Sequence, residues 1–245
     1  MISVHNLCKR FGTVQAVDGV TFSAADGEVT GLLGPNGAGK TTTLRMLYSL
    51  LPADSGKILV DGEELDADNH ALRSRLGVVP DAKGLYPRLS ARENITYFGR
   101  MQGLDKDFIA QRIEQLSSVL GMEDLLERRC DGCSQGQRVK VAIARALIHQ
   151  PRNILLDEPS NGLDVMSNRA LRQFILDRRA AGDCIVLSTH IMQEVAALCD
   201  RIVVIAAGHV ITSGAPEEIL AQSGESTLED AFVTLVGAAA EGLMA

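Results

Sequence analysis

Nine residues near the start of the chain combine glycine, lysine and threonine at a spacing that suits a bound phosphate group. Gly37 and Gly39 let the backbone turn tightly, so that several N–H groups can point at one anion. Lys40 can reach the β- and γ-phosphates of a nucleotide, and the Thr41 hydroxyl can bind Mg²⁺. The pattern predicts a nucleotide site, completed by Gly34, Pro35, Asn36, Ala38 and Thr42.

The residues on either side of this phosphate loop, residues 34–42, support that interpretation. An apolar run at 29–33 precedes the loop, and a helix-like run follows at 43–47. Strand, glycine loop and helix in this order are the context that a phosphate loop requires, since the helix adds free N–H donors and its positive dipole end. The simpler alternative is a glycine turn that only caps a helix, and the flanking runs favour nucleotide binding.

Acidic and histidine residues follow two later apolar runs. Asp157 and Glu158 come after the apolar residues 154–156, and His190 follows the run 184–187. Ligands of a doubly wound sheet bind at the carboxyl ends of its strands. Asp157 is therefore predicted to hold Mg²⁺ through water, and Glu158 to orient or deprotonate an attacking water. The alternatives are a strand-end cap for Asp157, and a helix cap or a buried histidine for His190.

Composition limits the class of protein. The chain has 245 residues, enough for one large domain or a domain with a subdomain. Its net charge is −7 with no long basic run, which argues against nucleic acid as the main partner. The N-terminus does not read as a signal peptide, and no run reaches the roughly 20 apolar residues of a membrane helix. We therefore expect a cytosolic chain that needs a separate membrane protein for any membrane role.

Two of the five cysteines, Cys130 and Cys133, have the spacing of a redox or zinc motif. No second pair of cysteine or histidine residues accompanies them, and the number of cysteines is odd. We therefore expect neither a disulfide framework nor a metal site here, and interpret the pair as small residues in a loop.

The first third of the chain is predicted to form mainly strands. Residues 2–33 read as strands and turns, and Asp26–Gly27 has the composition of a hairpin turn. Residues 57–60 and 75–79 are further predicted strands.

The period then becomes helical. Ser90 to Glu93 forms a capping-box pattern, and a second helix is predicted from about Asp105 to Gly121. We expect one apolar face on this helix, made of Phe108, Ile109, Ile113, Leu116, Val119 and Leu120. A further helix begins at Ser134, and the chain from about residue 215 is again helical. The block at about 88–133 therefore looks like a helical subdomain inserted in a domain of residues 1–220, followed by a short helical tail at 221–245.

Five motifs together resemble the ATP-binding subunit of ABC transporters over residues 1–220. The resemblance implies an α/β fold, in which a P-loop NTPase (RecA-like) core carries an N-terminal antiparallel β-subdomain and an inserted α-helical subdomain. The motifs occur in the order expected of that family: the phosphate loop, residues 134–137, residues 157–159, residues 161–164 and His190.

The resemblance implies a head-to-tail dimer that encloses two ATP molecules with Mg²⁺. Ser134, the Gly136 N–H and Gln137 would contact the ATP held by the opposite chain, where a helix N-terminus favours an anion. Asp164 would connect the two sites across the dimer.

Within its own chain, the resemblance makes Phe11 the aromatic residue that stacks on adenine. From spacing alone, packing of this ring on the sheet is favoured. His190 would contact the γ-phosphate and steady the water near Glu158, so that Glu158, His190 and Lys40 form the catalytic set.

The resemblance also implies partners and a function. The partners would be a second copy or a homologous ATPase subunit, and an integral membrane permease that holds the chain at the cytoplasmic face of the membrane. ATP hydrolysis would drive export, and residues 84–95 and 227–232 look like the sodium-efflux branch of the family. The alternative is a soluble ABC-type ATPase acting on a ribosome or DNA complex. Such proteins usually carry two cassettes or long basic insertions, whereas this chain has neither, so no nucleic-acid partner is expected.

Two positions depart from the family pattern. Gln135 places side-chain bulk in the 134–137 signature where the family usually has glycine. Asp81 stands where the family usually has a glutamine that senses Mg²⁺ and couples the site to the membrane subunit. Asp81 could reach Mg²⁺ through water, alongside Thr41 and Asp157, or it could leave the site and cap its loop.

Overall fold

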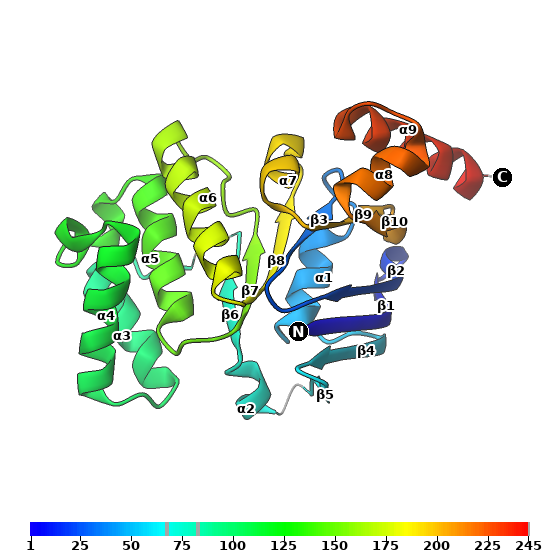
Figure 1. Ribbon diagram of the computed structural model, residues 1–245. Coiled ribbons are helices and arrows are strands. Elements are labelled where there is room, and N and C mark those ends of the chain that lie inside the picture. The colour runs from blue at the N-terminus through cyan, green and yellow to red at the C-terminus, as the bar shows by residue number, and fades with distance from the viewer. Residues whose placement is uncertain (67–68, 82–83, 245) are drawn as a thin grey trace.

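The computed structural model describes residues 1–66, 69–81 and 84–244, which form two β-sheets with helices around them (Figure 1). The larger sheet has six strands in the order β10-β9-β3-β8-β7-β6, all parallel to their neighbours except β10. Several are buried along their whole length, as expected for strands covered on both faces. The strands are β3 (Val29–Leu33), β6 (Leu76–Val79), β7 (Asn153–Asp157), β8 (Cys184–Thr189), β9 (Arg201–Ala206) and β10 (His209–Gly214).

The smaller sheet is antiparallel, with the order β2-β1-β4-β5. Its strands are β1 (Ile2–Phe11), β2 (Val14–Ala24), β4 (Ser55–Val60) and β5 (Glu63–Glu64). The strands predicted at 2–33, 57–60 and 75–79 are confirmed. The predicted hairpin turn at Asp26–Gly27 is wrong, because β2 belongs to the smaller sheet and β3 to the larger one. The hairpin of this region lies at Gly12–Thr13 instead, where Phe11 pairs with Val14.

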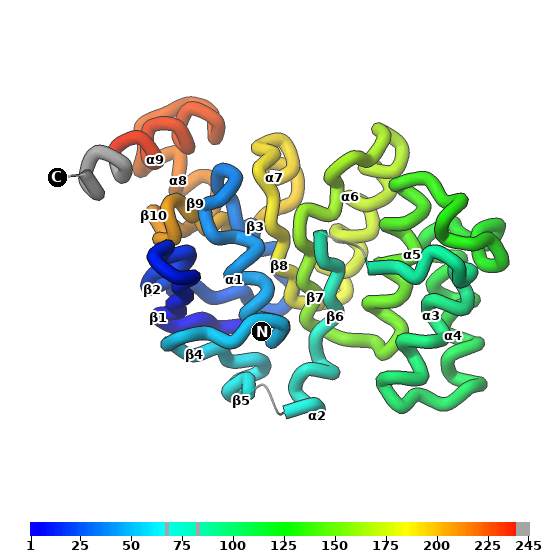
Figure 2. The backbone as a smooth tube through the Cα atoms, turned by 180° about the vertical axis from the view of Figure 1, so that it is seen from behind, coloured from blue at the N-terminus to red at the C-terminus, as the bar shows by residue number. Residues whose placement is uncertain are grey.

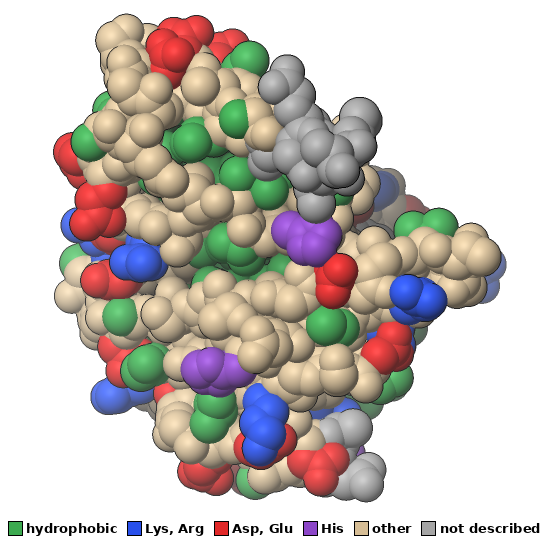
Figure 3. Space-filling view, turned by 90° about the vertical axis from the view of Figure 1, so that its right-hand side faces the viewer, with side chains coloured by type: hydrophobic (Ala, Val, Ile, Leu, Met, Phe, Trp, Pro, Cys, Tyr) green, Lys and Arg blue, Asp and Glu red, His purple; other side chains and the backbone are tan. Residues whose placement is uncertain are grey.

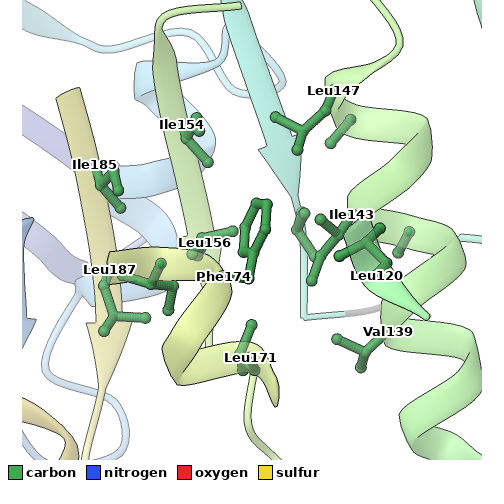
Figure 4. Close-up of a cluster of buried hydrophobic side chains, with 14 of the residues drawn as sticks. Leu120, Val139, Ile143, Leu147, Ile154, Leu156, Leu171, Phe174, Ile185 and Leu187 are labelled. Atoms are coloured by element: carbon green, nitrogen blue, oxygen red, sulfur yellow. The ribbon is translucent and has the colours of Figure 1, made fainter. Parts of the chain in front are cut away.

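The six-stranded sheet separates two apolar cores. Alternate residues of its strands face the helix α1 (Lys40–Leu47), which packs between the two sheets. The other residues face a larger cluster on the opposite side, shown in Figure 4. In that view Ile154, Leu156, Ile185 and Leu187 project from the strands toward Phe174 and toward helix residues Val139, Ile143 and Leu147.

Helices α3, α4 and α5 form a group at one end of the molecule, away from the smaller sheet (Figure 2). This group includes the helices of the predicted 88–133 block, and α5 extends it. The helices are α2 (His70–Arg73), α3 (Ala91–Met101), α4 (Lys106–Leu120), α5 (Gln135–Leu147), α6 (Val165–Ala180), α7 (Met192–Leu198), α8 (Pro216–Ser223) and α9 (Leu228–Met244), with short 3₁₀ turns at Glu123–Leu125 and Cys130–Gly132.

The helix predicted from Asp105 to Gly121 is confirmed as α4, with Asp105 as its N-cap and Gly121 left-handed at its C-terminus. One member of its predicted apolar face is wrong, because the Val119 side chain is 68% exposed. At 3.6 residues per turn, Val119 lies about 90° around the helix from the centre of the buried stripe. The helical period of α4 is confirmed, and its buried stripe is narrower than predicted.

Across the described residues, no helix combines the length and the apolar character needed to cross a bilayer. On the face shown in Figure 3, acidic and basic side chains are interspersed. Among the described residues visible there, the basic side chains stand apart from one another rather than forming one patch.

The capping box at the start of α3 is confirmed. The Ser90 hydroxyl accepts a hydrogen bond from the Glu93 amide at 3.1 Å, and the Glu93 carboxylate accepts one from the Ser90 amide at 2.8 Å. We expect Ser90→Ala to lower the free energy of unfolding by about 1 kcal/mol, because the Glu93 amide loses its acceptor. Thermal unfolding measures this as a fall of about 2–4 °C in Tm.

The matched control is Ser118→Ala, which removes an exposed hydroxyl from α4 and should leave the Tm nearly unchanged. Equal Tm values for the two variants would contradict a stabilising role for the cap.

Candidate functional site

The phosphate loop is shaped by close contacts that only glycine permits. Gly37 and Gly39 have φ values of +81° and +107°, in the region that favours glycine. A methyl group on Gly39 would lie 2.5 Å from the Ala16 carbonyl oxygen, and one on Gly34 would lie 2.1 Å from the Ile205 carbonyl oxygen. The loop is therefore held tightly against the ends of β2 and β9.

The start of α1 offers unused hydrogen-bond donors to the same space. The helix begins at Lys40 without a side-chain cap and without an acidic residue in its first turn. Its first N–H groups therefore lack intrahelical or capping partners and are free for an anion. They border a cavity of about 150 Å³ lined by Ala16, Asn36, Gly37, Ala38, Gly39, Lys40, Thr41, Thr42 and Glu158. These donors and the glycine geometry fit the phosphates of a nucleotide.

Lys40 is the buried cation of this cavity. Its side chain is 4% exposed, and Nζ donates hydrogen bonds to the carbonyl oxygens of Gly34 at 2.7 Å and Pro35 at 3.0 Å. Burial lowers the pKa of Lys40, while the nearby carboxylates of Glu158 and Asp157 act in the opposite direction. A desolvated ammonium group beside free N–H donors interacts strongly with an entering phosphate.

Asp157 and Thr41 bring hard oxygen atoms together next to the loop. The Thr41 hydroxyl donates to Asp157 Oδ1 at 3.2 Å, and the Ser188 hydroxyl donates to the same oxygen at 2.6 Å. Burial raises the pKa of Asp157, and these two hydrogen bonds oppose that rise. A hydroxyl and a carboxylate suit Mg²⁺, which takes few protein ligands and completes its shell with phosphate and water. The described residues contain no cluster of three or more acidic, cysteine or histidine side chains that could hold a metal.

Glu158 adopts a backbone conformation that is unusual for its type. Its φ is +43°, which for a non-glycine residue costs of order 1–3 kcal/mol. Its amide donates to the Ser188 hydroxyl at 3.1 Å and to the Ser188 carbonyl oxygen at 3.2 Å. The carboxylate then lies 3.3 Å from Nδ1 of the half-exposed His190 and 4.0 Å from Nζ of Lys40. Residues 118 and 32 positions apart from Glu158 are thus brought to one point.

Ser188 is the residue of this site that sequence reasoning missed. It lies at 0% exposure in the fully buried strand β8, directly opposite Asp157 in the parallel register of β7 and β8. The signal in the sequence was a hydroxyl residue that directly follows an apolar strand run. That signal is weak, because serine at a strand end is common.

Phe11 is placed at the end of β1 with 49% of its surface exposed. About half of the side chain is therefore covered and half is accessible, so both packing on the sheet and stacking on adenine stay predictions. The Lys9 ammonium lies 5.8 Å from the ring centroid. The exposed ring remains available for stacking, although it is not among the residues that line the phosphate-loop cavity.

The signature residues 134–137 cap their own helix. The Ser134 hydroxyl accepts from the Gln137 amide at 3.2 Å, and the Gln137 side chain accepts from the Ser134 amide at 2.9 Å. A methyl group on Gly136 would lie 2.2 Å from the Ser167 hydroxyl, so glycine is required for contact with α6. Of the described residues that line the phosphate-loop cavity, none comes from this signature. The helices α5 and α1 also pack on opposite faces of the six-stranded sheet.

Asp164 is the N-cap of α6. Its carboxylate accepts from the Ser167 amide at 2.8 Å and from the Ser167 hydroxyl at 3.0 Å. These bonds, led by the one from the Ser167 amide, lower the pKa of Asp164. Gln135 lies beside Gly162: a methyl group added to Gly162 would be 3.5 Å from Cγ of Gln135. The signature and the 161–164 motif therefore pack together within one chain.

Asp81 is exposed and borders a second cavity, of about 310 Å³, together with Cys130, Asp131, Gln135 and Arg138. Burial is the largest cause of the raised pKa of Asp157, and the negative charge of Asp81 acts in the same direction. The next two residues of its loop, 82 and 83, lie outside the described part of the chain. The five cysteines are free thiols, and burial raises the pKa of Cys130 to about 11.

Known proteins share this sequence pattern. The ABC transporter family model matches residues 17–161. The ABC transporter ATP-binding protein NatA of Bacillus subtilis is 44% identical over 239 residues, which cover 96% of this chain and 97% of that protein. The Nod factor export ATP-binding protein I of Ralstonia nicotianae is 39% identical over 90% of this chain and 68% of its own length.

Solved structures share the fold. The ATP-binding subunit of an ABC transporter has a TM-score of 0.88 at 29% identity and covers 96% of this chain and 99% of its own. A dimeric ATP-binding cassette, MJ0796 in a post-hydrolysis state with ADP and Pi, has a TM-score of 0.78 at 25% identity over 88% of this chain and 98% of its own. These likenesses confirm the predicted α/β fold. The match of the family model to more than half of the residues, together with the near-complete alignment to NatA, places the chain in the ABC transporter family of ATP-binding proteins.

Proposed function

We propose that this chain hydrolyses ATP as one half of a dimer and thereby drives export through a separate membrane protein. The observation that carries the proposal is the convergence of Lys40, Glu158 and His190 beside the phosphate loop. A nucleotide-binding module without hydrolysis would not need a carboxylate and an imidazole at that position.

Each residue has a role that follows from its chemistry. The loop N–H groups and Lys40 bind the phosphates. Bound Mg²⁺ neutralises phosphate charge, and Thr41 and, through water, Asp157 would hold it. Glu158 accepts a proton from the attacking water, and His190 steadies that water and the γ-phosphate. Phe11 stacks on the adenine ring.

The dimer supplies the contacts that one chain does not bring to its own loop. Ser134 and the Gly136 N–H lie at a helix N-terminus, which favours an anion, yet they are absent from the described lining of their own phosphate-loop cavity. We propose that they and Gln137 contact the ATP of a second copy or of a homologous subunit, with Asp164 between the two sites. The MJ0796 cassette, which shares the fold, was solved as a dimer.

Export is supported by relatives and by local sequence. One relative is named for Nod factor export, and residues 84–95 and 227–232 resemble the sodium-efflux branch. We propose Na⁺ as the first substrate to test, with the chain at the cytoplasmic face of the membrane on a permease. The net charge of −7 gives no support to a nucleic-acid partner.

The test is co-purification followed by reconstitution in vesicles. We expect a multi-spanning membrane protein to co-purify, and the pair to move ²²Na⁺ only when ATP is supplied. A complex that hydrolyses ATP at an unchanged rate without moving Na⁺ would remove sodium from the proposal and leave the ATPase intact. Failure to retain any membrane protein would contradict the transport role.

Asp81 offers a separate prediction. If it reaches Mg²⁺ through water, Asp81→Gln should preserve or raise ATPase activity, because the family's usual side chain restores that contact without the negative charge near Asp157. Steady-state ATPase assays and ATP-dependent flux in the reconstituted complex are the measurements. Loss of all coupling with ATP binding intact would favour the alternative, in which Asp81 caps its loop.

A further inference from the structure

Ser188 connects two functional groups through a single hydroxyl. Its side chain is fully buried, and Oγ donates a hydrogen bond of 2.6 Å to Asp157 Oδ1. The same oxygen accepts a hydrogen bond of 3.1 Å from the Glu158 amide. A hydroxyl has one donor hydrogen and two acceptor lone pairs, so both bonds form at once.

The sheet fixes this arrangement. Strands β7 and β8 pair in parallel with Asp157 opposite Ser188, so the hydroxyl meets the end of β7 where the functional carboxylates lie. The Ser188 carbonyl oxygen also accepts from the Glu158 amide, at 3.2 Å. The turn after β7 is thus tied to the neighbouring strand by both the side chain and the backbone of one residue.

Glu158 needs such an anchor because its backbone is left-handed at φ +43°. Residues keep a sparsely populated conformation only when the surrounding structure holds them in it. In this conformation the Glu158 carboxylate lies 3.3 Å from His190 Nδ1 and 4.0 Å from Lys40 Nζ. Relaxation of the turn would move the carboxylate away from both groups.

Asp157 depends on Ser188 in a different way. Its Oδ1 accepts from two hydroxyls, those of Ser188 and Thr41. In the proposed function the Thr41 hydroxyl would help to hold Mg²⁺, and the shorter bond from Ser188 would then orient the Asp157 carboxylate.

We propose that Ser188 is a positioning residue that holds the magnesium carboxylate Asp157 and the base Glu158 in one fixed geometry. This inference rests on the proposed function, since it assigns Ser188 a part in that reaction. Ser188 does not touch the substrate, and it acts through the two residues that do.

The test compares Ser188→Ala with Ser188→Thr, which keeps the hydroxyl, and with Ser117→Ala as a matched control. Ser117 is equally buried at 1% exposure, but its hydroxyl bonds the Glu114 carbonyl oxygen on α4, away from the site. For Ser188→Ala we expect turnover to fall about 10- to 100-fold with ATP affinity in EDTA unchanged, because a bond to a charged group is lost. Ser188→Thr should recover most of the turnover, and Ser117→Ala should keep it.

A readout other than turnover follows Asp157 directly. In a Glu158→Gln background, which removes the base, we expect Ser188→Ala to raise the Mg²⁺ concentration needed for half-maximal ATP-dependent dimerisation about 3- to 10-fold. Size-exclusion chromatography over a Mg²⁺ series measures this shift. A role in folding alone would lower the Tm without moving the Mg²⁺ midpoint.

Two results would overturn the inference: Ser188→Ala with unaltered turnover and Mg²⁺ midpoint, or a loss of turnover that Ser188→Thr fails to restore although its Tm is normal. Failure of the proposed function looks different. In that case Glu158→Gln would keep full turnover with Ser188 intact.

Discussion

Replacing Glu158 by glutamine should lower ATP turnover by about 10²–10⁴-fold, the usual contribution of a positioned general base. Glutamine preserves the shape of the side chain, so the loop and Lys40 should still bind ATP. Because ATP then persists, the dimer that hydrolysis would open should accumulate. Phosphate release measures the turnover, and light scattering with Mg²⁺ and ATP measures the dimer.

The matched control for this variant is Glu217→Gln, which neutralises an exposed carboxylate in the first turn of α8. It should hydrolyse ATP like the unaltered chain. Turnover by Glu158→Gln at the control rate would show that Glu158 is not the base. Loss of ATP binding would instead show that its carboxylate holds the loop together.

The second large effect is expected on binding. Lys40→Met should weaken ATP binding about 10- to 150-fold, because a hydrogen bond from a charged donor contributes about 1.5–3 kcal/mol. Methionine retains most of the apolar stem, so the buried position stays filled. Burial of the Lys40 ammonium costs desolvation free energy, and the same burial lowers the pKa of Lys40. Replacing it by an apolar side chain removes this cost, so the chain should remain folded. Titration with a fluorescent ATP analogue measures the affinity.

Lys57→Met is the control for Lys40, since Lys57 is largely exposed and pairs with the exposed Glu64 on the smaller sheet. Its ATP affinity should equal that of the unaltered chain. If Lys40→Met binds ATP just as tightly, the phosphates do not lie against Lys40, and the proposed arrangement of the loop fails.

Much of the fold was readable because its signals are local. The Ser90 capping box lies within four consecutive residues, and the structure shows both this box and the helix predicted to begin at Ser134. The α4 helix was bounded correctly because Asp105 and Gly121 act on their own helix ends. Where the decision involved a distant partner, local signals failed. Asp26–Gly27 has the composition of a hairpin turn, but the strands on either side of it join different sheets. The choice of sheet depends on pairing with residues far along the chain.

The same division applies to the candidate site. The glycine geometry of the phosphate loop could be predicted because nine consecutive residues contain its glycines, its lysine and its threonine hydroxyl groups. The Ser188 bridge could not, because it exists only when β7 and β8 pair with Asp157 opposite Ser188.

By itself, the sequence determined which chemical groups this protein has for binding and catalysis: the glycines and lysine of the phosphate loop, and the carboxyl and imidazole groups that follow two apolar strands. Backbone conformation and side-chain chemistry depend mainly on a few consecutive residues, so a short sequence motif is enough to predict them. Only the tertiary structure decided which of those groups share one space. It brings Lys40 and His190 each to the carboxylate of Glu158, and it packs the Ser134 helix on the opposite face of the sheet from the phosphate-loop helix. Pairing across the sheet depends on the whole chain at once, and no short stretch of sequence contains it.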